Sequence, residues 1–190
     1  MARPTEAQPA EHLKRGGARV ALVKSSFHAD LTGAMTASAR RALEEAGVKS
    51  DDIFEADAPG SFELPLVARR FAKRAEVAGV ICFGVVIKGE TTHDHHVATG
   101  ATYGIQQVML EEDKPVLLGV LTTNNLEQAQ ARALSPEDGG VHDKGRECAL
   151  ALVQLLNTLD ELEARLRDMN RLTRIVRSER ANVPVETDLN

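Results

Sequence analysis

Short apolar runs rich in β-branched residues alternate along the chain with longer segments whose apolar residues recur at helical spacing. This alternation is typical of parallel βαβ units, in which helices cover both faces of a buried sheet. The pattern predicts four strands, at residues 19–23, 52–58, 78–84 and 115–121. It predicts helices at residues 31–46, 62–75, 92–111, 126–133 and 144–159. We therefore expect a three-layer α/β/α sandwich around a four-stranded parallel sheet.

Residues that favour turns and caps support several of these boundaries. Gly47 follows the first predicted helix, and Pro59-Gly60 follows the second predicted strand. Glycine is favoured where a helix ends, and proline interrupts a strand. Asn124 or Asn125 is expected to cap the helix at residues 126–133.

Apolar residues continue beyond the last predicted core helix at steps of four and three residues. They are Leu155, Leu159, Leu162, Leu166 and Met169. The last helix is therefore expected to continue as an amphipathic extension. The stripe either meets a helix of a partner or packs on its own subunit, with the arginines between Arg165 and Arg180 as a solvated face. The chain then divides into a flexible tail (1–17), one domain (18–160) and a helical extension with a loose end from residue 181 (161–190).

Composition and charge narrow the functional classes. The 190 residues are 43% apolar, enough for one domain with a sizeable core, and the net charge is −5. No overall basic field attracts nucleic acid or an anionic membrane. The first 15 residues lack the apolar centre of a signal peptide, and the apolar runs fall short of the roughly 20 residues that span a bilayer. We expect a cytoplasmic protein, with Cys82 and Cys148 as small core residues.

Ligands of open α/β sheets bind outside the carboxyl ends of the strands, so the residues after each strand are candidates. Phe27 follows the first strand and is either a stacking platform for a planar ring or a core residue. Glu63 follows the second strand, where its carboxylate either interacts favourably with the positive end of a helix dipole or accepts hydrogen bonds from a polyol. Ser61 lacks the Gly-x-Ser-x-Gly context of hydrolases, which disfavours serine hydrolysis.

The segment after the third strand is rich in glycine and leads into a helix. Glycines and consecutive amides at a helix start form anion sites. Gly84 and Gly89 have the spacing of a P-loop, but Glu90 stands where that motif requires lysine. A carboxylate there would repel a triphosphate. The segment therefore predicts a site for a single phosphate and excludes nucleotide hydrolysis.

Histidines follow this segment directly. His93 is a candidate proton shuttle beside the predicted phosphate site, and a plain surface histidine is the alternative. Asp94, His95 and His96 come next, without the HExxH spacing of a zinc site. Because adjacent positions at a helix start scatter their side chains around the axis, we expect no bound metal.

Two basic residues follow the fourth strand. Arg132 lies in the helix at residues 126–133, and a glycine-rich loop then leads to Lys144. An arginine binds phosphate through its two-pronged fork and a lysine as a point charge. Both are candidate phosphate ligands, and solvated surface positions are the alternative.

Together these segments resemble the lumazine synthase family, in unbroken order over residues 19–159. The resemblance is carried by Ser26-Phe27-His28, Pro59-Gly-Ser-Phe-Glu-Leu-Pro65, Gly84-Val-Val-Ile-Lys-Gly-Glu-Thr-Thr-His93, Gly119-Val-Leu-Thr-Thr-Asn-Asn-Leu-Glu-Gln-Ala129, Ala131-Arg-Ala133 and Lys144-Gly145. It implies a flavodoxin-like fold and a homopentamer with active sites between subunits. The implied reaction condenses 5-amino-6-ribitylamino-2,4-pyrimidinedione with 3,4-dihydroxy-2-butanone 4-phosphate into 6,7-dimethyl-8-ribityllumazine, without cofactor or metal.

The resemblance also implies a role for each matching residue. The pyrimidine ring would stack on Phe27 and meet the backbone of Val86 and Ile87. The ribityl chain would be lined by Ser61, Phe62 and Glu63. The keto-phosphate would lie at Gly89, Glu90 and Thr91, beside the proton-transfer histidine, His93. The neighbouring subunit would supply Leu118, Lys144 and the phosphate-binding Arg132.

The chain departs from the family pattern at a few positions. Asp94 and His95 stand where an aromatic and an acidic residue are common, and Leu118 stands where an aromatic residue often closes the pocket. These changes motivate one alternative, a catalytically weak homologue that binds flavin or its precursor. A structural cage or scaffold is a third possibility. The eleven residues between Arg132 and Lys144 form a longer loop than in sixty-subunit shells. A pentamer or a pair of pentamers is therefore expected.

Overall fold

The computed structural model describes residues 12–181, with side chains described as far as residue 171. Its centre is a four-stranded sheet in the order β2-β1-β3-β4, and every pairing is parallel. The strands are β1 (Arg19–Ser25), β2 (Ile53–Ala58), β3 (Val77–Ile87) and β4 (Val116–Thr123). The predicted four-stranded parallel sheet is confirmed.

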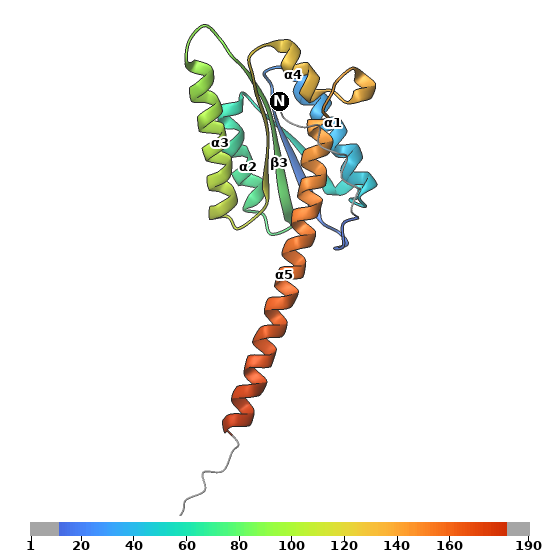
Figure 1. Ribbon diagram of the computed structural model, residues 1–190, viewed down its shortest axis with the longest axis vertical. Coiled ribbons are helices and arrows are strands. Elements are labelled where there is room, and N and C mark those ends of the chain that lie inside the picture. Colours follow the sequence, from blue (N-terminus) through green and yellow to red (C-terminus); the bar gives the residue numbers. More distant parts are fainter. Residues whose placement is uncertain (1–11, 182–190) are drawn as a thin grey trace, which may run out of the picture.

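Helices cover both faces of the sheet (Figure 1). One face carries α1 (Ala29–Glu45), α4 (Leu126–Ala133) and the start of α5 (Lys144–Ala181). The other carries α2 (Leu64–Ala72) and α3 (His93–Glu111). Short 3-10 turns occur at η1 (Ser50–Asp52), η2 (Ser61–Glu63) and η3 (Pro136–Asp138). Two apolar clusters, one on each side of the sheet, form the core of the three-layer, flavodoxin-like sandwich.

The third strand is longer than the sequence pattern predicted. We expected it to end at Gly84, but β3 continues to Ile87 and pairs with β4 through Thr123. Gly84 lies within the strand, and its missing side chain leaves room for a neighbour. A Cβ at Gly84 would lie 2.5 Å from the Ser61 hydroxyl oxygen. The extension carries the backbone of β3 out to the end of the sheet where ligands are expected.

Helix ends follow the predicted signals closely. The Asn125 side chain caps α4 by accepting a hydrogen bond from the Gln128 backbone N–H at 2.9 Å. Gly47, just after α1, has a φ of 97°, which favours glycine.

One helix differs from its predicted bounds. The helix predicted at residues 62–75 begins as the 3-10 turn η2, and its α-helical part ends at Ala72.

Both ends of the domain meet along α5. Of the tail predicted at residues 1–17, residues 12–17 are described, and the first of them are hydrogen-bonded to α5. The Asn157 side chain donates to the His12 carbonyl at 3.0 Å and accepts from the Lys14 backbone N–H at 2.9 Å. Arg15 pairs with Asp160. The loose end predicted from residue 181 lies, apart from that residue, outside the described residues.

The last helix, α5, continues to Ala181 and projects from the domain (Figure 1). Leu162 and Leu166 are 48% and 41% exposed. The interpretation in which the stripe packs on its own subunit is therefore wrong for these two residues. Within residues 12–181, no helix combines the length and apolar character needed to cross a membrane.

The two cysteines are buried as predicted, Cys82 in β3 and Cys148 in α5. Burial raises the pKa of both thiols, that of Cys148 to about 11. Because the thiolate is the reactive form, we predict that neither thiol reacts with Ellman's reagent in the native protein. Both should react promptly in denaturant, which provides the control. Rapid release of the chromophore from native protein would contradict this prediction.

Candidate functional site

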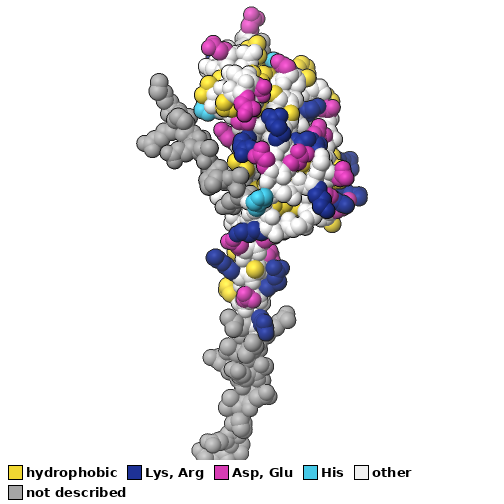
Figure 2. Space-filling model, turned by 90° about the vertical axis from the view of Figure 1, so that its right-hand side faces the viewer, with side chains coloured by type: hydrophobic (Ala, Val, Ile, Leu, Met, Phe, Trp, Pro, Cys, Tyr) yellow, Lys and Arg dark blue, Asp and Glu magenta, His cyan; other side chains and the backbone are white. Residues whose placement is uncertain are grey.

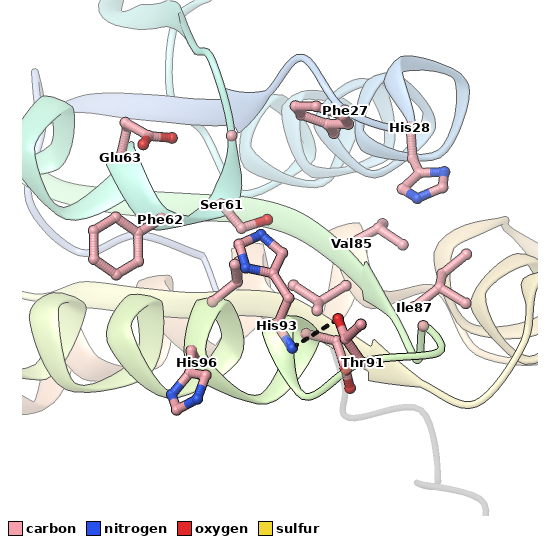
Figure 3. Close-up of a pocket in the computed structure, with 15 residues that line it drawn as sticks. Phe27, His28, Ser61, Phe62, Glu63, Val85, Ile87, Thr91, His93 and His96 are labelled. Atoms are coloured by element: carbon pink, nitrogen blue, oxygen red, sulfur yellow. Dashed lines mark hydrogen bonds between the residues drawn. The ribbon is translucent and has the colours of Figure 1, made fainter.

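A cavity of about 590 Å³ lies at the carboxyl ends of β1, β2 and β3, beside the first turn of α3 (Figure 3). Ligands are expected at this edge of an open α/β sheet. Most of the residues that the sequence singled out line this one cavity: Phe27, Ser61, Phe62, Glu63, Val86, Ile87, Gly89, Thr91 and His93. They come from three separate segments of the chain, which follow β1, β2 and β3, and the fold brings these segments together in one cavity.

Four predicted residues do not line the cavity of this chain. Glu90 lies in the exposed loop before α3, and Leu118 lies in β4. Arg132, in α4, donates to the Gln128 carbonyl at 3.0 Å, and Lys144 pairs with Glu147 at 3.3 Å. The family resemblance assigns Leu118, Arg132 and Lys144 to the cavity of a neighbouring subunit, so their absence from this one agrees with that expectation without testing it.

Two aromatic rings are exposed in the cavity. Phe27 is 69% exposed and Phe62 is 58% exposed. The alternative in which Phe27 is a core residue is therefore wrong. Exposed phenyl faces in a concave site are suited to a planar or apolar ligand.

The turn η2 is held in place by two glycines. Ser61 is buried over Gly84, and Phe62 lies against Gly100 of α3, where a Cβ would come within 2.4 Å of the ring. Glu63 ends the turn and points its carboxylate toward Gly60, where a Cβ would lie 3.0 Å from Oε2. Small residues at these contacts therefore determine where the Ser61 hydroxyl, the Phe62 ring and the Glu63 carboxylate sit.

The start of α3 has the features of an anion site. Its N-cap residue, Thr92, makes no side-chain capping hydrogen bond, so the first amides of the helix are not capped by it. Gly89 has open space where a side chain would project. Amides at the start of a helix attract anions through both hydrogen bonding and the helix dipole, and α3 is 19 residues long.

His93 is the first residue of α3, and its side chain points toward Ser61 in the cavity (Figure 3). Its backbone N–H donates to the Thr91 hydroxyl at 3.4 Å. Asp94 and His96 also line the cavity, whereas His95 lines a smaller cavity beside it. Among the described residues, no group of three or more His, Cys, Asp or Glu side chains is arranged to hold a metal ion.

His28 also lines the cavity, although the sequence analysis gave it no role. It is the N-cap residue of α1 and has a left-handed backbone, with φ 55° and ψ 50°. Its carbonyl accepts hydrogen bonds from the backbone N–H groups of Leu31 and Thr32 at 3.0 Å. Histidine tolerates this conformation better than most residues. Its position between a strand and a helix was the available signal, but the direction of its side chain required the structure.

This fold and site define a class: a flavodoxin-like α/β protein in which one cavity holds aromatic surface, a carboxylate, a histidine and the start of a helix without a side-chain cap. Residues 17–160 match the family model of 6,7-dimethyl-8-ribityllumazine synthase. The chain belongs to this family. It is 38% identical over 146 residues to the synthase of Thermus thermophilus, covering 77% of this chain and 90% of that one. It is 39% identical over 146 residues to the synthase of Xanthomonas campestris, covering 76% and 92%.

Proposed function

We propose that this chain is a transferase of riboflavin biosynthesis that makes 6,7-dimethyl-8-ribityllumazine from the ribitylamino-pyrimidinedione and the keto-phosphate. One observation carries the proposal: Phe27, Glu63 and His93, from three separate segments, face one cavity at the ends of the strands in a member of this family. The match over residues 17–160 supports a synthase domain at residues 18–160. The cytoplasm is the proposed location.

The pyrimidinedione lies in the part of the cavity between α1 and β3. Its ring stacks on Phe27, and its polar edge meets the backbone of Val86 and Ile87. The ribityl chain lies along η2, where Ser61 and Glu63 hydrogen-bond its hydroxyl groups and Phe62 packs against its carbons. The exposed rings and the fixed position of η2 support this arrangement.

The keto-phosphate lies at the start of α3, where the amides of Gly89, Glu90 and Thr91 surround its phosphate. Among the described residues that line this cavity, none is an arginine. We infer that a neighbouring subunit of a homopentamer supplies Arg132 and Lys144, with Leu118 closing the pyrimidine pocket. Light scattering should give five or ten times the 20.6 kDa of the chain. A sixty-subunit particle would contradict this assembly.

The reaction begins when the 5-amino group condenses with the ketone to an imine and releases water. Elimination then releases inorganic phosphate, and ring closure releases a second water. The protein supplies proximity, since both substrates are held in one cavity. His93 transfers protons, and Arg132 stabilises the departing phosphate.

The test is to mix the protein with both substrates and follow the fluorescence of the lumazine. The two alternatives predict different results. A binding homologue would take up the pyrimidinedione without accelerating the reaction. A cage would keep its assembly after the site is destroyed. The departures at Asp94, which lines the cavity, and at Leu118 motivate the first alternative.

The contact between Phe62 and Gly100 provides a further prediction. Gly100→Ala places a methyl group against the ring, which must move. We expect a severalfold higher KM for the pyrimidinedione and little change in the KM for the keto-phosphate, measured by steady-state kinetics. Gly33→Ala is the matched control, because a Cβ at this helical glycine meets nothing within 4 Å. Equal effects of the two variants on KM would refute the proposed role of the contact.

A further inference from the structure

The start of α5 is tied to α1 by one pair of side chains. The Ser38 hydroxyl donates to Asp143 Oδ2 at 2.6 Å, and this serine is only 4% exposed. The other carboxylate oxygen of Asp143 accepts from the Arg146 backbone N–H at 2.9 Å, as the side chain of a helix cap does. Asp143 therefore holds the first turn of α5 with one oxygen and α1 with the other.

A close backbone contact strengthens the same junction. A Cβ at Gly145 would lie 2.1 Å from the carbonyl oxygen of Met35, so this glycine lets α5 lie directly against α1. Met35 is itself fully buried. Lys144 stands between Asp143 and Gly145 in the sequence. The backbone of Lys144 is therefore fixed on both sides.

The loop between α4 and α5 is tied back to α4. The backbone N–H groups of Val141 and His142 both donate to the Ala131 carbonyl, at 2.8 and 2.9 Å. Ala131 comes directly before Arg132, and His142 comes two residues before Lys144. The two candidate phosphate ligands are thus connected through a short series of hydrogen bonds as well as through the loop.

The surface around α1 carries charges of both signs. Acidic and basic side chains are interspersed on the side of the domain that carries α1 (Figure 2). Arg40 pairs with Glu55, and Arg146 pairs with Glu45, each at 2.7 Å. Binding of a phosphate near this surface therefore depends on where individual cations stand, because hydrogen bonds require a defined distance and angle.

We propose that Asp143 and Ser38 are positioning residues that hold Lys144 where it can bind the same phosphate as Arg132. The proposal rests on the proposed function, which assigns both cations to the phosphate of the keto-phosphate. A ligand binds more tightly when the groups that contact it are ordered beforehand, because ordering them on binding lowers the affinity. The pair of Ser38 and Asp143 acts through Lys144 and does not itself contact the substrate.

The first test measures binding of inorganic phosphate to the full-length protein by calorimetry. Ser38→Ala removes the tie to α1 and leaves the helix cap. Its Kd for phosphate should rise about tenfold, the effect of losing one hydrogen bond to a charged group. Asp143→Asn should bind like the unaltered protein, because the amide can donate to the Ser38 hydroxyl and its oxygen can still cap the helix. An unchanged Kd in Ser38→Ala would overturn the proposal.

Asp138→Ala is the matched control for Ser38→Ala. It removes a second hydrogen bond between a serine and an aspartate, from the Ser135 hydroxyl to Asp138 at 2.7 Å, within the same loop. Its Kd for phosphate should stay unchanged. A rise equal to that in Ser38→Ala would show that any loss of order in the loop has the same effect, and would overturn the specific role of the Ser38–Asp143 pair.

The second test combines these changes with Lys144→Ala. If the pair acts through Lys144, Ser38→Ala should raise the Kd in the unaltered protein and have no effect in protein that already carries Lys144→Ala. An equal rise in both would show a purely structural role and overturn the proposal. An unchanged Kd in Lys144→Ala alone would overturn both the phosphate role of Lys144 and this proposal. Phosphate binding with the expected pattern in a protein that makes no lumazine would support the positioning role and contradict only the proposed function.

Discussion

Replacing Arg132 with alanine is expected to raise the KM for the keto-phosphate by about 10- to 100-fold. Hydrogen bonds to charged groups contribute about 1.5–3 kcal/mol, and each 1.4 kcal/mol corresponds to a factor of ten. The free energy of unfolding should change little, because Arg132 is exposed and its side chain bonds only to a carbonyl of its own helix among the described hydrogen bonds. Steady-state kinetics and chemical denaturation measure the two quantities.

Two further variants define what Arg132 contributes. Arg132→Lys keeps the positive charge but loses the two-pronged guanidinium group. Its KM for the keto-phosphate should therefore lie between that of the unaltered protein and that of Arg132→Ala. Arg41→Ala removes another exposed arginine, on α1, and should leave the KM unchanged. An unaltered KM in Arg132→Ala would exclude the phosphate-binding role and, with it, the proposed contribution of the neighbouring subunit.

Replacing His93 with alanine is expected to lower kcat by roughly 100-fold without abolishing turnover. General acid–base groups contribute about 10²–10⁴-fold, while proximity of two bound substrates supplies much of the remaining rate. His93 lies exposed at the start of α3, so the fold should tolerate the change. Single-turnover kinetics at saturating concentrations of both substrates measures the chemical step.

His95→Ala is the matched control for this variant. His95 lies two residues further along α3 and lines the smaller cavity instead of the main one. Its replacement should leave kcat within about twofold, since surface substitutions are usually mild. Equal losses in His93→Ala and His95→Ala would show that the region matters only for structure, and an unchanged kcat in His93→Ala would remove its catalytic role.

The sequence predicted the layers of the fold because periodicity reports which face of an element is buried. It misplaced the end of β3, since Gly84 was interpreted as the last strand residue before a glycine-rich exit, whereas the strand continues past it and its missing side chain leaves room for the Ser61 hydroxyl. Local patterns do not record which distant residue fills the space above a glycine. The same limitation affects Phe27, whose exposure depends on how α1 leaves the sheet.

The candidate site was predictable as far as one chain contributes to it. Segments that follow parallel strands meet at one edge of the sheet, so Phe27, Glu63 and His93 had to lie near one another. His28 gained significance only from its left-handed backbone and its place in the cavity. Arg132 and Lys144 do not line this cavity. Their proposed site lies in a neighbouring subunit, and periodicity and spacing within one chain do not encode how subunits assemble.

The structure shows that the departures from the family pattern lie at different distances from the proposed reaction. Asp94 lines the cavity next to His93, where the reaction is proposed to occur. His95 lies outside that cavity. The first departure therefore bears on catalysis more directly than the second.

The central claim is that the assembled protein makes lumazine from the two substrates. The most direct measurement follows lumazine fluorescence and inorganic phosphate together in one time course, with a protein-free sample alongside. The proposed function predicts that both products appear at the same rate, well above the spontaneous rate. Product formation no faster than in the protein-free sample would contradict it.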